Sequence, residues 1–236
     1  MSEADVQANA VGTHPLDAVI WNALTTRQRR FAAVESKAVR FTGDIAPFGA
    51  LADLSQEAFA DLRLLIEAQG PAALVTTSAF ALPAGFAVVR SGALLQMIWQ
   101  GELEPQNDFE HVILTEADTP EMLALTTATQ PGPFGPRTVE LGTYLGVRRE
   151  GKLAAMAGER LSFDGFTEIS AVCTDPAFRG KGFAASLMKL LISTITARGE
   201  TPFLHVFSSN ENAIRIYRAL GFVDRREMHL NVLGVA

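Results

Sequence analysis

The sequence predicts an α/β protein of the α+β type, with a mixed, mostly antiparallel sheet flanked by helices. Three strand-like runs between residues 138 and 174 are separated only by turns at Gly151 and at Asp164–Gly165, as in an antiparallel meander. Two runs with helical spacing follow and end at Gly199 and Gly221, where glycine commonly ends a helix. The apolar run between these helices, "PFLHVFS", is typical of a buried strand.

The first 110 residues predict a lobe that is helical first and then forms strands. Apolar residues recur at helical spacing over 16–32, after Pro15. A second helix is expected from Ser55, a good N-cap, to Gly70, a good C-cap. The runs 71–79 and 86–99 are expected to be strands.

The remaining residues, 111–236, predict a second domain. Its elements begin with a strand at 111–116 and a helix at 117–129, which has Asp118 or Thr119 at its cap and Pro120 in its first turn. The run "PGPFGP" must be a loop. The strands 138–150, 152–163 and 166–174 follow, then a helix to about Arg198, a strand at 202–208, a helix at 210–220 and a strand at 226–233.

The two parts share one local pattern, a Gly-Phe pair before an apolar strand, at 85–86 and at 221–222. The N-terminal lobe is therefore a candidate for a degenerate copy of the second domain, although a single shared pair also arises by chance. The charged and proline-containing stretch 104–112 is the candidate connection between the two parts.

The composition excludes several classes of protein. A formal net charge of −6 and a pI of about 5.3 argue against a nucleic-acid binder. A single cysteine, Cys173, excludes an intrachain disulfide, and the scattered histidines have no metal-ligand spacing. The first twelve residues have no leader pattern, and no stretch is apolar enough to span a membrane. We therefore expect no metal and no membrane partner, and a cytoplasmic protein; its oligomeric state is open, a homodimer being one option.

The stretch "TDPAFRGKGFAASLM", residues 174–188, carries the strongest chemical indication. It places two glycines and two cations at the start of a helix, where free amide groups and the helix dipole favour an anion. A simply capped helix with two exposed cations is the alternative interpretation. The stretch is neither a Walker loop nor a dinucleotide fingerprint, because the residue after Lys181 is not Ser or Thr and the three spaced glycines are missing.

The order of elements, together with two spaced motifs, resembles the GCN5-related N-acetyltransferase (GNAT) superfamily, in its FR47-like branch, over residues 111–235. The motif residues are Arg179, Gly182, Ala184, Asn210, Ala213, Tyr217, Gly221 and Phe222. The resemblance implies the GNAT fold and acetyl-CoA as cosubstrate. It also implies a set of cofactor contacts: the turn Arg179, Gly180, Lys181, Gly182, Phe183 and Ala184 for the pyrophosphate, and Val172, Cys173, Thr174 and Asn210 for the pantetheine arm, with Asn212 as a second candidate.

The catalytic groups expected from the resemblance are a tyrosine and a carboxylate. Tyr217 lies one turn after Ala213 and is the candidate acid that protonates the leaving thiolate. Glu168 is the candidate base, since strand alternation places it on one face with Ser170, Val172 and Thr174.

Several other residues have weaker predicted roles. Glu159 is the second candidate base, Glu140 a candidate contact for a cationic acceptor, and Phe134 a wall of the acceptor pocket. Cys173, on the face opposite Glu168 by alternation, is interpreted as a core thiol, and His205 as a satisfied core or cleft histidine.

These predictions favour an acetyl-CoA-dependent N-acetyltransferase that acts directly on a primary amine of a small molecule, an amino acid or a peptide. A non-catalytic acyl-CoA-binding or regulatory module with the same fold is the alternative, and a nucleotide-binding α/β protein is a third possibility. Tyr217 and Glu168 favour the enzyme over the binding module.

Overall fold

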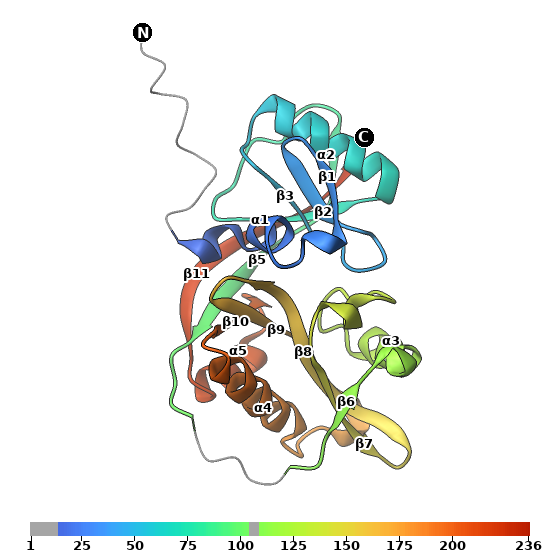
Figure 1. Cartoon of the computed structure of the whole chain (residues 1–236), viewed down its shortest axis with the longest axis vertical. Coiled ribbons are helices and arrows are strands. Elements are labelled where there is room, and N and C mark those ends of the chain that lie inside the picture. The colour runs from blue at the N-terminus through green and yellow to red at the C-terminus, as the bar shows by residue number, and fades with distance from the viewer. Residues whose placement is uncertain (1–13, 104–108) are drawn as a thin grey trace. The chain divides into compact units, whose positions relative to one another are not determined.

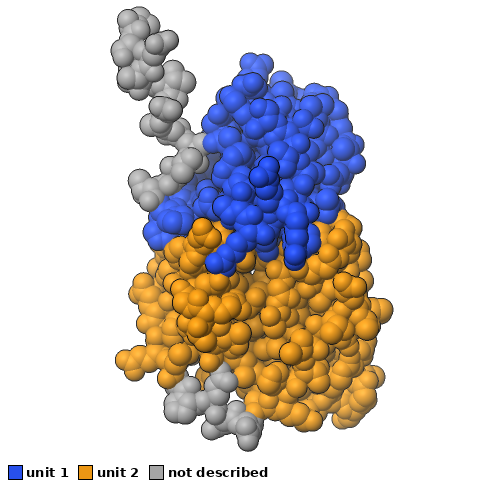
Figure 2. Space-filling model, in the orientation of Figure 1, with its two compact units in different colours: residues 1–43, 47–94, 227–236 blue, residues 44–46, 95–226 orange. Residues whose placement is uncertain are grey.

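The computed structural model describes residues 14–103 and 109–236 and divides into two compact units (Figure 2). Unit 1 comprises residues 1–43, 47–94 and 227–236, and unit 2 comprises 44–46 and 95–226. Two predictions lie outside the described residues. One is the lack of a leader pattern in the first twelve residues, and the other is most of the predicted connection 104–112. The boundaries between the units fall inside two long strands, between residues 94 and 95 and between residues 226 and 227. The organisation into domains 1–110 and 111–236 stays a prediction.

Unit 1 begins with short helices and a small antiparallel sheet (Figure 1). Its elements are η1 (Pro15–Ala18), α1 (Val19–Thr25), η2 (Arg29–Phe31), β1 (Ala32–Glu35), β2 (Ala38–Phe41), β3 (Gly49–Leu51), α2 (Gln56–Gln69) and β4 (Ala72–Thr76). It also contains residues of β5 (Phe86–Trp99) and β11 (Phe222–Val235), both of which continue in unit 2. Within unit 1, residues 229–233 of β11 pair antiparallel with residues 72–76 of β4.

The prediction of one helix over residues 16–32 was wrong. Helix α1 ends at Thr25, and the hydroxyls of Thr25 and Thr26 donate hydrogen bonds back to the carbonyl oxygens of Trp21 and Asn22. Such bonds from threonine compete with the backbone ladder and favour a helix end. The strands β1, β2 and β3 were missed because they are three to four residues long and are stabilised by pairing with one another.

Unit 2 is built on the predicted antiparallel meander of three strands, which the structure confirms as β7 (Tyr144–Arg149), β8 (Lys152–Phe163) and β9 (Phe166–Thr174). The strand order in this unit is β11-β5-β10-β9-β8-β7-β6. The other elements are β6 (Val112–Leu114), η3 (Glu116–Asp118), α3 (Thr119–Thr129), η4 (Thr138–Leu141), η5 (Pro176–Phe178), α4 (Phe183–Ala197), β10 (Thr201–Phe207) and α5 (Glu211–Ala219). The expected strand 138–150 was wrong over its first part, which forms η4 instead.

Helices cover both faces of the sheet in unit 2, as predicted for the fold class (Figure 1). On one face, buried side chains of α4, such as Leu187 and Leu191, pack with Ile169 of β9 and Leu204 of β10. On the other face, Met122 and Leu125 of α3 pack in a separate cluster that includes Cys173. We call these the α4 face and the α3 face.

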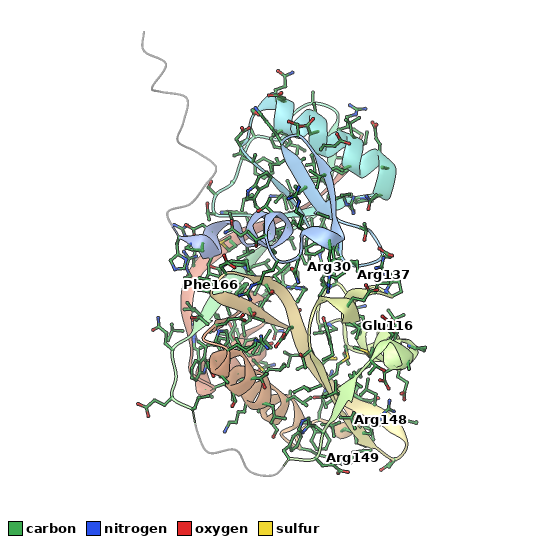
Figure 3. The ribbon with its side chains drawn as sticks, in the orientation of Figure 1. Arg30, Glu116, Arg137, Arg148, Arg149 and Phe166 are labelled. Atoms are coloured by element: carbon green, nitrogen blue, oxygen red, sulfur yellow. The ribbon has the colours of Figure 1, made fainter. Side chains whose placement is uncertain are left out.

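Strands β9 and β10 pair parallel over a short stretch. Residues 166–168 pair with 201–203, and Phe166, where this pairing begins, is labelled in Figure 3. Beyond these residues β9 carries a bulge, because Gly158 faces Ser170 while Met156 faces Cys173. Ala171 has a φ of 53°, a left-handed conformation that is uncommon outside glycine. We call the unpaired stretch after Glu168 and Phe203 the opening between β9 and β10.

Candidate active site

The start of helix α4 has the features of an anion site. Gly180 and Gly182 both have a φ of 77°, which residues with a side chain rarely adopt, and Gly182 is the N-cap without a capping side chain. The first amide groups of a helix have no intrahelical partner. Arg179 and Lys181 are exposed on either side of Gly180, and the Lys181 ammonium lies 5.0 Å from the centre of the Phe178 ring. The turn therefore offers backbone donors and two cations in one place.

The strand and helix that flank the opening hold the other predicted cofactor residues. Val172 and Thr174 on β9 are half-buried, and the Cys173 side chain is buried. Asn210 is the N-cap of α5, where its Oδ1 accepts a hydrogen bond of 3.2 Å from the Ala213 amide. The Asn212 side chain accepts a hydrogen bond from Arg215 within the same helix. Asn210 thus caps helix α5. A contact between pantetheine and either asparagine stays a prediction.

Tyr217 lies on α5 and packs against the cluster of the α4 face. Its ring packs against Phe222 with centroids 6.2 Å apart. Burial raises the pKa of the Tyr217 hydroxyl to about 12, and the nearby Cys173 adds to the increase. A tyrosine with a raised pKa keeps its proton at neutral pH, so this group is suited to donate a proton and not to accept one.

The three carboxylates expected near the acceptor are each paired with an arginine. Arg137 donates to both oxygens of Glu140, at 2.5 and 2.8 Å, and is labelled in Figure 3. Arg198 donates to Glu159 at 2.9 Å. Arg137 also pairs with Asp44 at 3.0 Å, and Arg198 also pairs with Glu200 at 3.3 Å. Each of these two arginines is therefore shared by two carboxylates.

Glu168 is the most constrained of the three. Its side chain is fully buried, and Arg160 donates to its two oxygens at 2.8 Å each, a bidentate pair. His205 Nδ1 lies 2.8 Å from Glu168 Oε1. Burial raises the pKa of this carboxyl, but Arg160 and His205 outweigh burial, and the net pKa is about 2. Such a carboxylate is a poor proton acceptor at neutral pH, so the geometry argues against the predicted role as a direct base.

The predicted face assignment along β9 was also wrong. Ile169 and Val172 both pack on the α4 face, whereas Ala171 and Cys173 lie on the α3 face. The bulge inserts one extra residue and reverses the alternation, which a period-two pattern cannot anticipate. Cys173 therefore shares a face with Glu168, and burial raises the pKa of its thiol to about 11, as for a core thiol.

Phe134 lies in the predicted loop and packs edge-on against the fully buried Tyr144, with ring centroids 5.6 Å apart. Gly158 of β8 allows this arrangement, since a Cβ there would lie 2.2 Å from the Tyr144 ring. Phe134 is thus part of the cover of the α3 face, and its role as a wall of the acceptor pocket stays a prediction.

Sequence reasoning missed Arg160, Gln96 and Arg225, which join Glu168 and His205 in one hydrogen-bonded group. The sequence gave little indication of these contacts, because a polar or charged residue in a strand is most often at the surface. Within the described parts of the chain, no three His, Cys, Asp or Glu residues are grouped closely enough to hold a metal ion. In the same parts, no helix has the length and apolar character needed to cross a membrane.

Comparison with known proteins agrees with this arrangement. Residues 144–230 match the family model described as FR47-like protein. The chain is 41% identical to a GNAT-family protein of known structure from Novosphingobium aromaticivorans, with a TM-score of 0.88, and the match covers 94% of this chain and 99% of that one. The chain belongs to the GNAT superfamily.

More distant GNAT relatives share parts of this fold. A GCN5-related N-acetyltransferase-like protein from Streptococcus suis has a TM-score of 0.62 at 16% identity, covering 91% of this chain and 92% of that one, and shows likeness of fold alone. The N-alpha-acetyltransferase RimI of Mycobacterium tuberculosis is 34% identical over 98 residues, which are 39% of this chain. The matched part spans 60% of the length of that relative.

Proposed function

We propose that this GNAT protein is an acetyl-CoA-dependent N-acetyltransferase that transfers the acetyl group directly to a primary amine. One observation carries the proposal: after the strand β9, which borders the opening between β9 and β10, the chain passes through η5 to a helix start that has two cations and no side-chain cap. A strand edge without a partner has free backbone donors and acceptors that can pair with the amides of an extended ligand.

The residues present fit acetyl-CoA by their chemistry. The amides after Gly182, with Arg179 and Lys181, would hold the diphosphate, since helix starts favour phosphate groups. The backbone of Val172, Cys173 and Thr174 would pair with the pantetheine arm. The cosubstrate supplies an activated thioester, and the protein supplies orientation and proton handling.

Tyr217 is the proposed proton donor. Its pKa, raised to about 12, keeps the hydroxyl protonated at neutral pH. A tyrosine hydroxyl beside the leaving sulfur would donate its proton as the thiolate departs, which is general acid catalysis. The acceptor amine must arrive neutral or lose its proton to a group other than the paired Glu168.

The candidate acceptors are small molecules, amino acids and peptide termini. The name of the Mycobacterium tuberculosis relative indicates activity on α-amines for that protein, which makes peptide α-amines the first acceptors to test here. Glu168 is buried and held by Arg160, so it is not expected to bind a cationic acceptor. A cytoplasmic location and the oligomeric state stay predictions.

The proposal is tested by binding first and by turnover second. Calorimetry should show that acetyl-CoA binds in preference to ATP and NAD, and CoA release should then be measured with peptides, amino acids and small amines. Tyr217→Phe should lower kcat by about a hundredfold or more while acetyl-CoA affinity is unchanged, as for loss of a general acid. Tight binding with no turnover on any amine would support the non-catalytic module, and preference for ATP or NAD would contradict both.

A further inference from the structure

Five polar side chains on neighbouring strands of unit 2 form one hydrogen-bonded chain. The strand order β11-β5-β10-β9-β8 contributes Arg225, Gln96, His205, Glu168 and Arg160, one residue from each strand. The links measure 2.6 Å from Arg225 Nη1 to Gln96 Oε1, 3.0 Å from Gln96 Nε2 to His205 Nε2, and 2.8 Å from His205 Nδ1 to Glu168 Oε1. The bidentate pair with Arg160 completes this group, which we call the cross-sheet chain.

The direction of these bonds follows from the chemistry at the Arg225 end. A guanidinium only donates, so Gln96 Oε1 is the acceptor and Gln96 Nε2 must donate to His205 Nε2. His205 therefore carries its proton on Nδ1 and donates to Glu168. Along the chain, Arg225 donates to Gln96, Gln96 donates to His205, and His205 donates to the Glu168 carboxylate. Both ring nitrogens of His205 therefore take part in hydrogen bonds.

The cross-sheet chain lies at the end of the opening between β9 and β10, the proposed site of the pantetheine arm. Glu168 is paired with Phe203 at the last residue before the opening between β9 and β10. His205 lies two residues further along β10, already within the opening. The His205–Glu168 bond therefore links the two strands just where their backbone pairing stops. Three members of the cross-sheet chain are buried, with Gln96 and Glu168 at 0% exposure and Arg160 at 7%, and His205 and Arg225 are half-buried.

We propose that the cross-sheet chain sets the width of the opening between β9 and β10, with His205 and Glu168 as its positioning residues. This inference rests on the proposed function, because the opening is the proposed binding site for the pantetheine arm. Neither residue then serves as the base of the reaction. The lone pair of His205 Nε2 is occupied by Gln96, and the Glu168 carboxylate is held by Arg160.

The test compares two substitutions that both remove the imidazole. His205→Asn keeps an amide donor near the position of Nδ1 and retains the bond to Glu168. His205→Gln places its amide near Nε2 and loses that bond. We expect His205→Asn to stay within about threefold of wild-type acetyl-CoA affinity and KM, and His205→Gln to weaken both by about tenfold with a smaller change in kcat, as expected for one charge-assisted hydrogen bond.

Three outcomes separate this proposal from its alternatives. If both substitutions lower kcat by a hundredfold or more at unchanged KM, His205 is the base and the positioning proposal is wrong. If both leave KM and affinity unchanged, the bond does not set the opening and the proposal is also wrong. If the wild-type protein itself binds no acetyl-CoA, the proposed function fails first, which distinguishes the two failures.

A spectroscopic readout tests the chain without any ligand. In the whole protein labelled with ¹⁵N-histidine, the His205 ring should show a protonated Nδ1 and an unprotonated Nε2. Gln96→Met should disturb this signature, whereas His111→Phe, a change at an exposed histidine of the same unit, should not. Observation of the opposite tautomer would overturn the proposed bond directions, and with them the cross-sheet chain.

Discussion

Units 1 and 2 repeat the same succession of elements. In unit 1, the antiparallel strands β1, β2 and β3 are followed by α2 and then β4. In unit 2, β7, β8 and β9 are followed by α4 and β10. A parallel bridge between Phe48 and Ala73 in unit 1 corresponds to the parallel pairing of β9 and β10 in unit 2.

The strands that close each succession are also alike. Strands β5 and β11 each have 14 residues, and each begins directly after a glycine in the left-handed region, Gly85 with a φ of 88° and Gly221 with a φ of 92°. This is the Gly-Phe pattern seen in the sequence. A common origin of the two halves stays a prediction, but the comparison is useful because the halves differ where function is expected.

The difference lies at the start of the helix. In unit 1, the Ser55 hydroxyl caps α2 by accepting a hydrogen bond of 3.2 Å from the Ala58 amide, and Glu57 is acidic. In unit 2, Gly182 leaves the start of α4 without a side-chain cap, and Arg179 and Lys181 stand before it. One helix start thus has a side-chain cap, and the other has none.

The middle strands of the two meanders differ in a second way. Each has a buried arginine, Arg40 on β2 and Arg160 on β8. Arg40 donates to backbone carbonyl oxygens, among them that of Gly70 at 2.6 Å, and burial lowers its pKa. Arg160 instead pairs with the Glu168 carboxylate. The same residue type thus serves a helix end in one unit and holds a buried carboxylate in the other.

The largest expected effect is on stability, from Arg160→Met. The substitution leaves the Glu168 carboxylate buried without its arginine and with only the hydrogen bond from His205, so the free energy of unfolding should fall by about 3–5 kcal/mol. Arg40→Met leaves only neutral carbonyls and should cost about 1–3 kcal/mol. Urea titrations of both variants test the difference, and equal losses would contradict the distinction between the two arginines.

Acid should remove part of the same stabilisation. The pKa of Glu168 lies at about 2 in the folded protein, below its ordinary value of 4.5. The stabilisation is therefore fully present above about pH 4.5 and is lost as the pH falls toward about 2. The stability gap between wild type and Arg160→Met, measured with urea at several pH values, should narrow over this range. The gap between wild type and Arg40→Met should not.

The smallest of these effects concerns the two helix starts. Gly182→Asp adds a negative charge at the proposed diphosphate site and should weaken acetyl-CoA binding by about tenfold or more. Ser55→Ala, its counterpart in unit 1, should lower stability by about 1 kcal/mol and leave that affinity unchanged. Calorimetry measures the acetyl-CoA affinity of both variants, and urea titration measures their free energies of unfolding. Unchanged acetyl-CoA affinity in Gly182→Asp would contradict the assignment of the site.

The sequence by itself determined the fold class, the three-strand meander of unit 2, the glycine turn before α4 and the cap of α5. These features depend on local chemistry: alternating or helical spacing, glycine at positive φ, and a capping Asn210. Local patterns also sufficed for the strand Phe86–Trp99, whereas the last strand, expected at 226–233, extends over Phe222–Val235.

Only the tertiary structure decided the face on which each residue of β9 lies and the partners of its charged groups. The bulge at Ala171 reverses the alternation, and it arises from pairing with β8, not from the sequence of β9 alone. Glu168 meets Arg160 and His205 from two different strands. Contacts between strands distant in sequence set both the burial and the pKa of this carboxylate, so no local pattern predicts either.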